Sequence, residues 1–179
     1  MAKKYTININ NGQGTENILN DTYNVTAEST GYVNSSITPT TVTIIDGTND
    51  YIFTMAAEGT LTLHVTETGE ETGVPISGAT FYRTDADGNT YGNPITTNEQ
   101  GNAIFANVPY ATTGAPNIYF KQTTSDGNHN FNSEVVTITL TSQTNTEQIT
   151  NPLPLPKTIK LTDINYNNLP IATSTITLQ

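Results

Sequence analysis

Apolar and polar residues alternate along most of this chain with a period of two, which is the spacing of side chains on the two faces of a β-strand. No amphipathic pattern with the helical period continues for even about a dozen residues. Threonine and asparagine number 36 and 22 of the 179 residues. Threonine is β-branched and suits pleated strands, whereas asparagine and glycine suit tight turns. The sequence therefore predicts an all-β protein.

Turn residues separate the alternating segments, and they include Asp46-Gly47, Asp87-Gly88-Asn89, Glu99-Gln100-Gly101-Asn102 and Asp126-Gly127-Asn128. Short strands at this spacing are typical of a β-sandwich or a barrel. We predict strands over residues 5–10, 22–28, 40–45, 51–56, 60–66, 79–84, 103–108, 117–123, 134–141, 158–163 and 174–178.

The composition excludes several classes of function. A net charge of -10 with only six lysines and arginines argues against binding to nucleic acid or to anionic membranes, since both need cations. The chain has no cysteine and no apolar run long enough to cross a bilayer. No secretory signal is visible after Met1, which is expected if a leader has been removed or if the protein leaves the cell by another route, such as lysis.

The chain contains an internal repeat with a period of about 94 to 98 residues. Four pairs of segments carry it: 74–81 with 169–176, 60–63 with 158–161, 119–122 with 23–26, and 135–138 with 41–44. In this alignment, the loop before the repeated segment is three residues shorter in the second copy. The two strands at the C-terminal end thus repeat the first strands of the middle segment, and the N-terminal end repeats its later strands.

This repeat divides the chain into three parts. Residues 1–58 form the back of one domain, residues 59–157 form a complete domain that ends in a proline-rich connector, and residues 158–179 form the first two strands of another domain. The two ends together have about the length of one domain, which random truncation would not produce. We predict tandem prealbumin-like or Ig-like β-sandwiches, one complete and one split between the chain termini.

Five motifs of the middle segment are informative together: Pro75-Ile76-Ser77-Gly78-Ala79-Thr80-Phe81, Asp85-Ala86-Asp87-Gly88-Asn89, Thr97-Asn98-Glu99-Gln100-Gly101-Asn102-Ala103-Ile104-Phe105, Asn107-Val108-Pro109 and Ile118-Tyr119-Phe120-Lys121. They resemble the CnaB, or SpaA-like, prealbumin-type β-sandwich, which occurs as a stalk repeat in Gram-positive surface adhesins and pilins. The resemblance covers residues 59–141 well and the two ends weakly. It supports a fold more than a function.

Members of that family often carry an isopeptide bond from lysine to asparagine or aspartate, promoted by a buried glutamate. The resemblance places His64 on the strand of that lysine and Gln122 at the position of that glutamate, and we expect no such bond in residues 59–157. In the domain assembled from the two ends, Lys160 and Glu28 are the corresponding candidates. An ordinary solvated Lys160 is the alternative.

Half of a sandwich exposes apolar strand faces and unpaired backbone groups, which associate with an available strand. We expect the C-terminal segment of one copy to complete the N-terminal part of the next by strand donation, which gives an open head-to-tail filament. The alternating prolines of residues 151–156 favour polyproline II, which carries the donor forward. The predicted donor residues are Ile159, Leu161, Leu169, Ile171, Ile176 and Leu178. The predicted acceptor residues are Tyr23, Val25, Val42, Ile44, Tyr51, Phe53 and Met55.

One acidic motif resembles the start of a calcium loop. Asp85-x-Asp87-x-Asn89 has the first ligand spacing, but Thr90 and Thr96 occupy the sixth and twelfth positions, where glycine and glutamate are required. We therefore predict a type I′ hairpin turn at Asp87-Gly88 instead of a metal site.

The remaining polar candidates are weak. His64 and His129 lie far apart in the sequence without clustered carboxylates, and no serine lies in a nucleophile motif. We expect no metal, no cofactor and no enzymatic activity. Ser35, Ser36 and Ser77 lack both a nucleophile motif and a paired histidine. Asn20, Asn24 and Asn34 match glycosylation acceptors, and Tyr91, Tyr110 and Tyr119 are candidates for a glycan-binding surface.

The sequence thus predicts a structural subunit of a self-assembling extracellular filament, such as a spore or cell-surface appendage, whose main partner is another copy of itself. A phage virion protein of the tail, head fibre or capsid decoration is one alternative. A monomeric adhesin stalk module, whose ends close on themselves, is another. A host-surface glycan or protein is a further candidate partner.

Overall fold

The strands of the middle segment form two sheets that face each other, which we call the sandwich (residues 57–151). Strand β3 lies between β6 and β9 in a three-stranded sheet, and it is antiparallel to β6 and parallel to β9. The second sheet has the order β5-β4-β7-β8. The strands are β3 (Ala57–Thr66), β4 (Thr80–Thr84), β5 (Thr90–Thr96), β6 (Asn102–Tyr110), β7 (Asn117–Thr124), β8 (Val135–Thr139) and β9 (Thr144–Thr150).

Alternate residues of both sheets point inward and form one hydrophobic core. On β3, for example, Leu61, Leu63 and Val65 are buried while the residues between them are not. Phe105 of the first sheet meets Phe120 of the second edge to face, with ring centroids 4.7 Å apart. The core consists of Leu61, Leu63, Val65, Ile76, Ala79, Phe81, Ala103, Phe105, Val108, Ile118, Phe120, Ile138 and Leu140.

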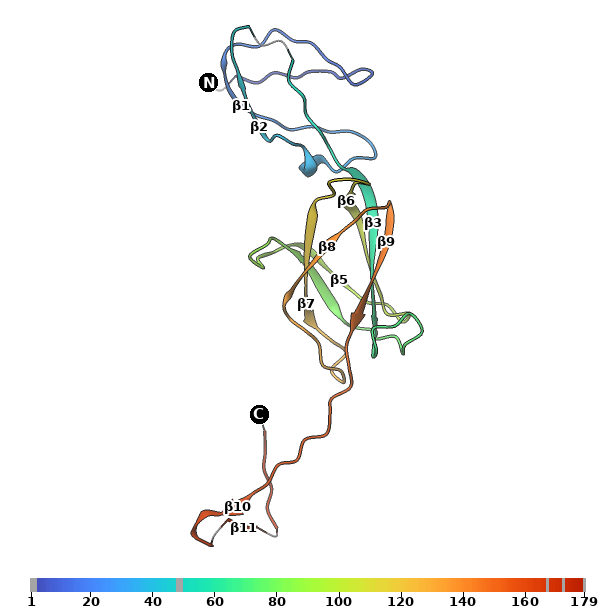
Figure 1. The fold of residues 1–179 in the computed structure, drawn as a ribbon, viewed down its shortest axis with the longest axis vertical. Coiled ribbons are helices and arrows are strands. Elements are labelled where there is room, and N and C mark those ends of the chain that lie inside the picture. The colour runs from blue at the N-terminus through green and yellow to red at the C-terminus, as the bar shows by residue number, and fades with distance from the viewer. Residues whose placement is uncertain (1–2, 48–49, 167, 172, 179) are drawn as a thin grey trace.

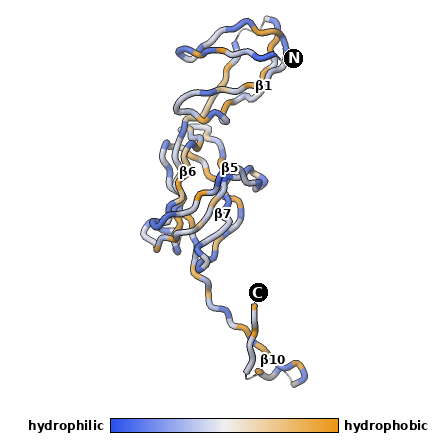
Figure 2. The backbone as a smooth tube through the Cα atoms, turned by 180° about the vertical axis from the view of Figure 1, so that it is seen from behind, coloured by the Kyte–Doolittle hydropathy of each residue, from blue (hydrophilic) through white to orange (hydrophobic). Residues whose placement is uncertain are grey.

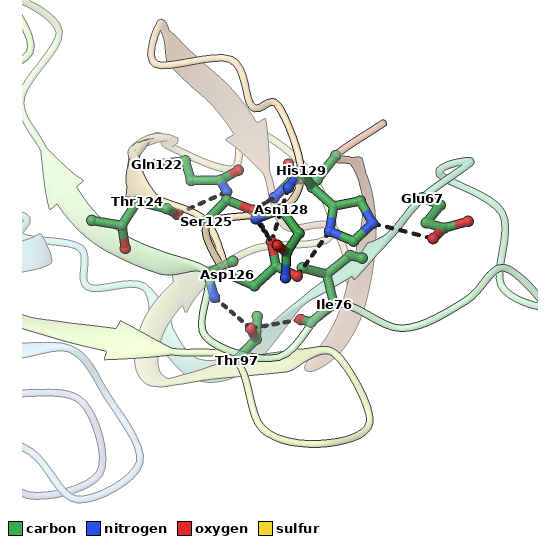
Figure 3. A network of polar contacts seen from close by, with 11 residues as sticks. Glu67, Ile76, Thr97, Gln122, Thr124, Ser125, Asp126, Asn128 and His129 are labelled. Atoms are coloured by element: carbon green, nitrogen blue, oxygen red, sulfur yellow. Dashed lines mark hydrogen bonds and ion pairs between the residues drawn. The ribbon is translucent and has the colours of Figure 1, made fainter. Parts of the chain in front are cut away.

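The repeated Pro-Ile-Ser-Gly-Ala segment connects the two sheets, and a buried threonine holds it in place. The Oγ1 hydroxyl of Thr97 donates to the carbonyl oxygen of Ile76 at 2.7 Å and accepts from the N–H of Ala79 at 2.9 Å (Figure 3). These bonds satisfy backbone groups that the sheet ladders do not reach, which buried polar groups require. The segment therefore has a fixed path between β3 and β4.

Residues on either side of the sandwich form two smaller units, which we call the head (residues 3–56) and the tail (residues 158–178). The structure, a computed structural model, describes residues 3–47, 50–166, 168–171 and 173–178. Figure 1 shows the head and the tail at opposite ends of an elongated chain. The head contains β1 (Asp21–Asn24), a short 3-10 turn (Asn34–Ser36) and β2 (Thr41–Ile44); the tail contains β10 (Thr162–Asp163), a 3-10 turn (Ile164–Tyr166) and β11 (Leu169–Pro170).

The predicted all-β fold is confirmed, and no described helix is long and apolar enough to cross a membrane. The short strand β11 of the tail was not predicted, and two strands of the sandwich were missed because they lack apolar alternation. Strand β5 contains Gly92 and Pro94 and lies at the edge of its sheet, and β9 is mostly polar and also lies at an edge. Edge strands tolerate such residues because one side of their backbone makes no hydrogen bonds to a neighbouring strand.

Several predicted strands at the two ends are wrong for a single chain. Residues 5–10 contain only the turn bridge between Asn10 and Gln13, and residues 51–56 contain only the isolated bridge from Thr54 to Thr38. In the tail, pairing is limited to Thr162 and Asp163 within 158–163, and no strand forms in 174–178. A strand needs a neighbouring strand for its backbone bonds, and the described residues of the head and the tail do not supply one at these places.

The predicted hairpin between β4 and β5 exists, but its turn is not type I′. A type I′ turn needs two consecutive residues with positive φ, and here Gly88 has a φ of 86° while Asp87 is not among the residues with positive φ. The N–H of Gly88 donates to the carbonyl of Asp85 at 3.2 Å, and Asp85 and Asn89 also pair. The loop is therefore a three-residue connection with glycine in the left-handed position.

Candidate self-assembly interface

The tail forms a small hairpin that has no partner among the described residues of the chain. Thr162 pairs with Pro170, and the N–H of Ile171 donates to the carbonyl of Leu161 at 3.1 Å. The tail residues whose side chains are described, which leave out Tyr166 and Leu169, are exposed except Asp163, which is half-buried. The hairpin therefore presents its apolar residues to solvent.

The sandwich contains the same hairpin between β3 and the segment that leads to β4. Thr66 pairs with Pro75, and the N–H of Ile76 donates to the carbonyl of Val65 at 2.9 Å. Each of these four residues lies 95 or 96 positions before its counterpart in the tail. Pairing geometry thus supports the internal repeat independently of sequence similarity.

This pairing corrects the register of the repeat. The predicted match of residues 60–63 with 158–161 is wrong, because the paired residues make 62–65 the counterpart of 158–161. The loop between the two strands is then one residue shorter in the tail, and not three. In a Thr-rich strand, a shift of two residues keeps every side chain on the same face, which is why alternation alone did not reveal the error.

Four predicted donor residues match core residues of the sandwich. The sandwich residues are at most 3% exposed, whereas their tail counterparts are between 40% exposed (Leu161) and 56% exposed (Ile159). Burial of such side chains is worth about 1.5–3 kcal/mol each before the costs of ordering. The matched pairs are Leu63 with Ile159, Val65 with Leu161, Ile76 with Ile171 and Phe81 with Ile176.

The other two predicted donor residues match positions outside the core. Leu178 corresponds to Arg83, which is half-buried, and Leu169 corresponds to Val74, which is exposed. The side chain of Leu169 itself lies outside the described part of the chain. Of the six predicted donor residues, the repeat therefore matches only the four named above to the core of the sandwich.

The head repeats the pairing of β7 with β8. Tyr23 of β1 lies opposite Val42 of β2, as Phe120 of β7 lies opposite Val136 of β8. The predicted matches of residues 23–26 with 119–122 and of residues 41–44 with 135–138 differ from this pairing by one residue in total, so they cannot both hold. The head thus presents an inward-facing surface of later strands.

That surface is incompletely covered. Val33 and Ile37 are the buried hydrophobic residues among the described positions of the head, and neither was predicted as an acceptor. Phe53 is exposed, and the other six predicted acceptor residues are half-buried. Figure 2 shows apolar residues along both the head and the tail. The described head residues contain no strand that corresponds to β3 or β4, and these are the strands that the tail repeats.

Comparison with known families decides the fold. Residues 61–152, just over half of the chain, match the SpaA prealbumin-like fold domain. The chain belongs to this family. The matched residues are those of the sandwich, so the SpaA-like resemblance of the middle segment is confirmed.

Solved structures with a similar fold include the Bacillus anthracis TIE protein (TM-score 0.42, 15% identity, 63% of this chain and 20% of that one). The major pilin subunit of Bacillus cereus has a TM-score of 0.42 and 17% identity over 57% of this chain and 32% of its own. The minor pilin of Streptococcus agalactiae has a TM-score of 0.47 and 12% identity over 68% and 62%. This SpaA-family chain thus spans less than two thirds of their lengths. No curated protein matches the sequence.

Of the two candidate cross-link residues of this SpaA-like chain, Lys160 matches the position expected of the lysine, whereas Glu28 lies beyond the end of β1. Lys160 corresponds to His64, whose Nδ1 lies 2.7 Å from Oδ1 of Asn102, on the outer face of the sheet. Gln122 lies within β7, whereas Glu28 lies outside the strand β1 that is paired like β7. The geometry therefore gives no support to a bond that depends on Lys160 and Glu28.

The acidic loop of the SpaA-like domain uses its carboxylate within the turn. Oδ1 of Asp85 accepts from the N–H groups of Asp87 and Asn89 at 3.0 and 2.9 Å, and Oδ2 accepts from Nδ2 of Asn89 at 2.8 Å. These bonds, first the side-chain bond from Asn89, lower the pKa of Asp85 below its ordinary value. No group of three metal-ligating side chains occurs among the described residues.

The other sequence candidates are not brought together. Tyr91 and Tyr119 lie on the four-stranded sheet, whereas Tyr110 lies on the three-stranded sheet. The three tyrosines therefore do not lie on one sheet. Arg83 lies over the Tyr91 ring, 5.4 Å from its centroid. Ser36 donates to the carbonyl of Val33 at 2.6 Å, which is a local structural role.

His129 joins two loops at the pole where the chain leaves the SpaA-like domain. Its Nδ1 lies 2.8 Å from Oδ2 of Asp126, and its Nε2 lies 3.1 Å from Oε1 of Glu67 (Figure 3). Burial opposes the charge on the ring, but the hydrogen bonds that the ring donates to Glu67 and Asp126, with the negative charges of these carboxylates, outweigh it and raise the pKa of His129 above its ordinary value. The sequence did not indicate this contact because Glu67 and His129 lie 62 residues apart.

The stability of the sandwich should therefore decrease as the pH rises through the raised pKa of His129. An unfolded histidine titrates near 6.5, so the stabilisation is complete below that pH and is lost as the folded ring deprotonates. We expect the Tm followed by circular dichroism to fall by a few degrees between about pH 6 and about pH 9. His129→Gln should abolish that fall, whereas the control His64→Gln should retain it. An equal fall in both variants would contradict the assignment.

Proposed function

We propose that this chain is a structural subunit of a self-assembling extracellular filament, such as a cell-surface or spore appendage, with no enzymatic role. Copies join head to tail by strand donation. The tail of one copy supplies the first two strands of a SpaA-like sandwich, and the head of the next copy supplies the later strands. Each filament then alternates complete sandwiches with sandwiches shared by two copies.

One observation carries this proposal. The tail reproduces the pairing of β3 with the segment before β4, and the head reproduces the pairing of β7 with β8. The two ends thus supply different parts of one fold. Apolar strand faces that remain uncovered in one chain favour association with a matching strand.

The connector between the sandwich and the tail favours association between copies over closure of one chain on itself. Asn151 is fully buried, and its N–H donates to the carbonyl of Thr66 at 2.9 Å, which fixes the start of the connector. Residues 152–157 contain three prolines and span about 20 Å as polyproline II. The ten residues of β3 alone span about 33 Å. Residue 158 is therefore held too far from the head of its own chain.

Negative-stain electron microscopy of the purified full chain tests the proposal. We expect filaments that form without any other component, with an axial repeat of roughly 70–80 Å for two domain lengths. Compact monomers at high concentration would contradict the proposal and favour a module whose ends close on themselves. Assembly only on a capsid or a phage tail would favour a virion protein instead.

A further inference from the structure

Strand β3 has two neighbours in the sandwich, and both contribute to its position. It is antiparallel to β6, where Leu63 lies opposite Ala103 and His64 lies opposite Asn102. It is parallel to β9 over the seven residues from Thr60 to Thr66. A strand that replaced β3 in a shared sandwich would need one neighbour of each kind.

The first neighbour has a counterpart in the head, which we call the arm (residues 5–10). Asn11 and Asn107 both have positive φ, 49° and 56°, and lie 96 positions apart. At the same spacing, Ile7 and Ile9 of the arm match Ala103 and Phe105, which are inward-facing residues of β6. The tail has the same spacing from β3, because Leu161 matches Val65. One period of 96 residues therefore relates β6 to the arm and β3 to the tail.

The arm has the properties of a strand without a neighbour. Ile7 is 39% exposed and Ile9 is 65% exposed, whereas Ala103 and Phe105 are buried. Within the described residues, positions 5–9 make no backbone hydrogen bond to another strand. Neither isoleucine belonged to the predicted acceptor set, although both lie on the predicted strand 5–10.

The second neighbour of β3 is β9, and its counterpart in the head is the segment of residues 51–56. This segment follows β2 in the chain, as β9 follows β8. Residues 51–56 contain half-buried Tyr51 and Met55, and their described backbone bonds involve only Thr54 and Ala56. These bonds join Thr54 to Thr38 and the carbonyl of Ala56 to Val33. Residues 51–53 have no such bond among the described residues, so this part of the segment is free to accept a strand.

We propose that residues 158–162 of a second copy enter between the arm and residues 51–56, antiparallel to the arm and in a single register. In the sandwich, Leu63 lies opposite Ala103 and His64 lies opposite Asn102. Adding 96 to each β3 residue number and subtracting 96 from each β6 residue number places Ile159 opposite Ile7 and Lys160 opposite Thr6. This inference rests on the proposed strand-donation function and specifies its docking surface. Ile7 and Ile9 then form the layer of the shared core that Ala103 and Phe105 form in the sandwich.

The pair of Lys160 with Thr6 is suited to a direct test. The N–H of Val65 donates to the carbonyl of Gly101 at 2.8 Å, so Val65 and Gly101 are a hydrogen-bonded pair. Because the two kinds of pair alternate, His64 and Asn102 are a non-hydrogen-bonded pair, with Cα atoms about 4.5 Å apart. That separation lies within the range of a disulfide. Lys160 and Thr6 would inherit this geometry on the outer face, without change to the core.

The experiment is oxidation of the double variant Thr6→Cys/Lys160→Cys, followed by electrophoresis in SDS without reductant and by microscopy of the same sample. The chain has no cysteine of its own. We expect a ladder of covalent dimers and higher oligomers that reductant collapses to the monomer. The matched control Asn8→Cys/Lys160→Cys is displaced by two residues on the same face and should remain largely monomeric. Each single variant should give no product larger than a dimer.

The other outcomes separate this inference from the proposed function. Filaments without a ladder, or a ladder from the displaced control and none from the test pair, would overturn the register and leave strand donation in place. A disulfide within the monomer band would place the tail in its own head and overturn both. The absence of filaments from the unmodified chain would contradict the proposed function itself.

Discussion

A chain that ends at residue 157 should remain folded and soluble but should form no filaments. The deletion leaves the core residues of the sandwich and the buried Asn151 in place. It removes every residue that repeats β3 and the segment leading to β4. We expect electron microscopy to show particles without elongation, and sedimentation to show a monomer, while the thermal transition of the sandwich persists.

A synthetic peptide of residues 158–179 provides the complementary measurement. Added to the truncated chain, it should bind the head and shift the fluorescence of the tyrosines there, since a donated strand would cover Tyr23 and Tyr51. Added in excess to the full chain, it should shorten filaments because it occupies heads without offering a new one. Filament growth by the truncated chain would contradict strand donation. A shuffled peptide of the same composition is the control.

Ile176→Asp should prevent elongation almost as completely as the deletion. Ile176 corresponds to Phe81, which is 3% exposed in the sandwich, so the substitution places a carboxylate in the shared core. An unpaired buried charge costs several kcal/mol even after relaxation. Because each 1.4 kcal/mol is tenfold in affinity, we expect the critical concentration for assembly to rise by about a hundredfold or more.

Thr175→Asp is the matched control for this substitution. It adds the same charge one residue earlier, at the counterpart of Thr80, whose Oγ1 pairs with Oγ1 of Thr96 across the two strands, 3.0 Å away. That position lies outside the core, so assembly should be close to normal. Critical concentrations measured by pelleting would distinguish the two variants. Equal loss in both would indicate a charge effect and contradict burial of Ile176.

The sequence was sufficient for the all-β class and for the SpaA-like sandwich, because the information for both is largely local. Threonine content and alternation identify strands, and the turn glycines Gly88 and Gly101, with φ of 86° and 74°, occur where the turns were predicted. The edge strands β5 and β9 escaped detection because solvent surrounds much of each, and their residues carry no apolar pattern.

The candidate interface was predicted less completely. Its donor and acceptor segments followed from the repeat, but the register did not, because short Thr-rich strands align almost equally well when shifted. The backbone pairing of Thr162 with Pro170 resolves that ambiguity, and it links two segments by geometry. The arm residues Ile7 and Ile9 were absent from the predicted acceptor set because alternation identifies residues 5–10 as a strand but does not identify the strand that pairs with it. The His129 contact depends on a long-range approach that no local pattern encodes.

The parallel pairing of β3 with β9 has a mechanical consequence. The chain enters the sandwich through β3 and leaves it through β9, and the two strands are paired from Thr60 opposite Thr144 to Thr66 opposite Thr150. Tension applied to the two ends of a subunit would pull these strands in opposite directions along their length. The backbone hydrogen bonds between β3 and β9 would then bear the load together in shear. They would not break one after another from one end.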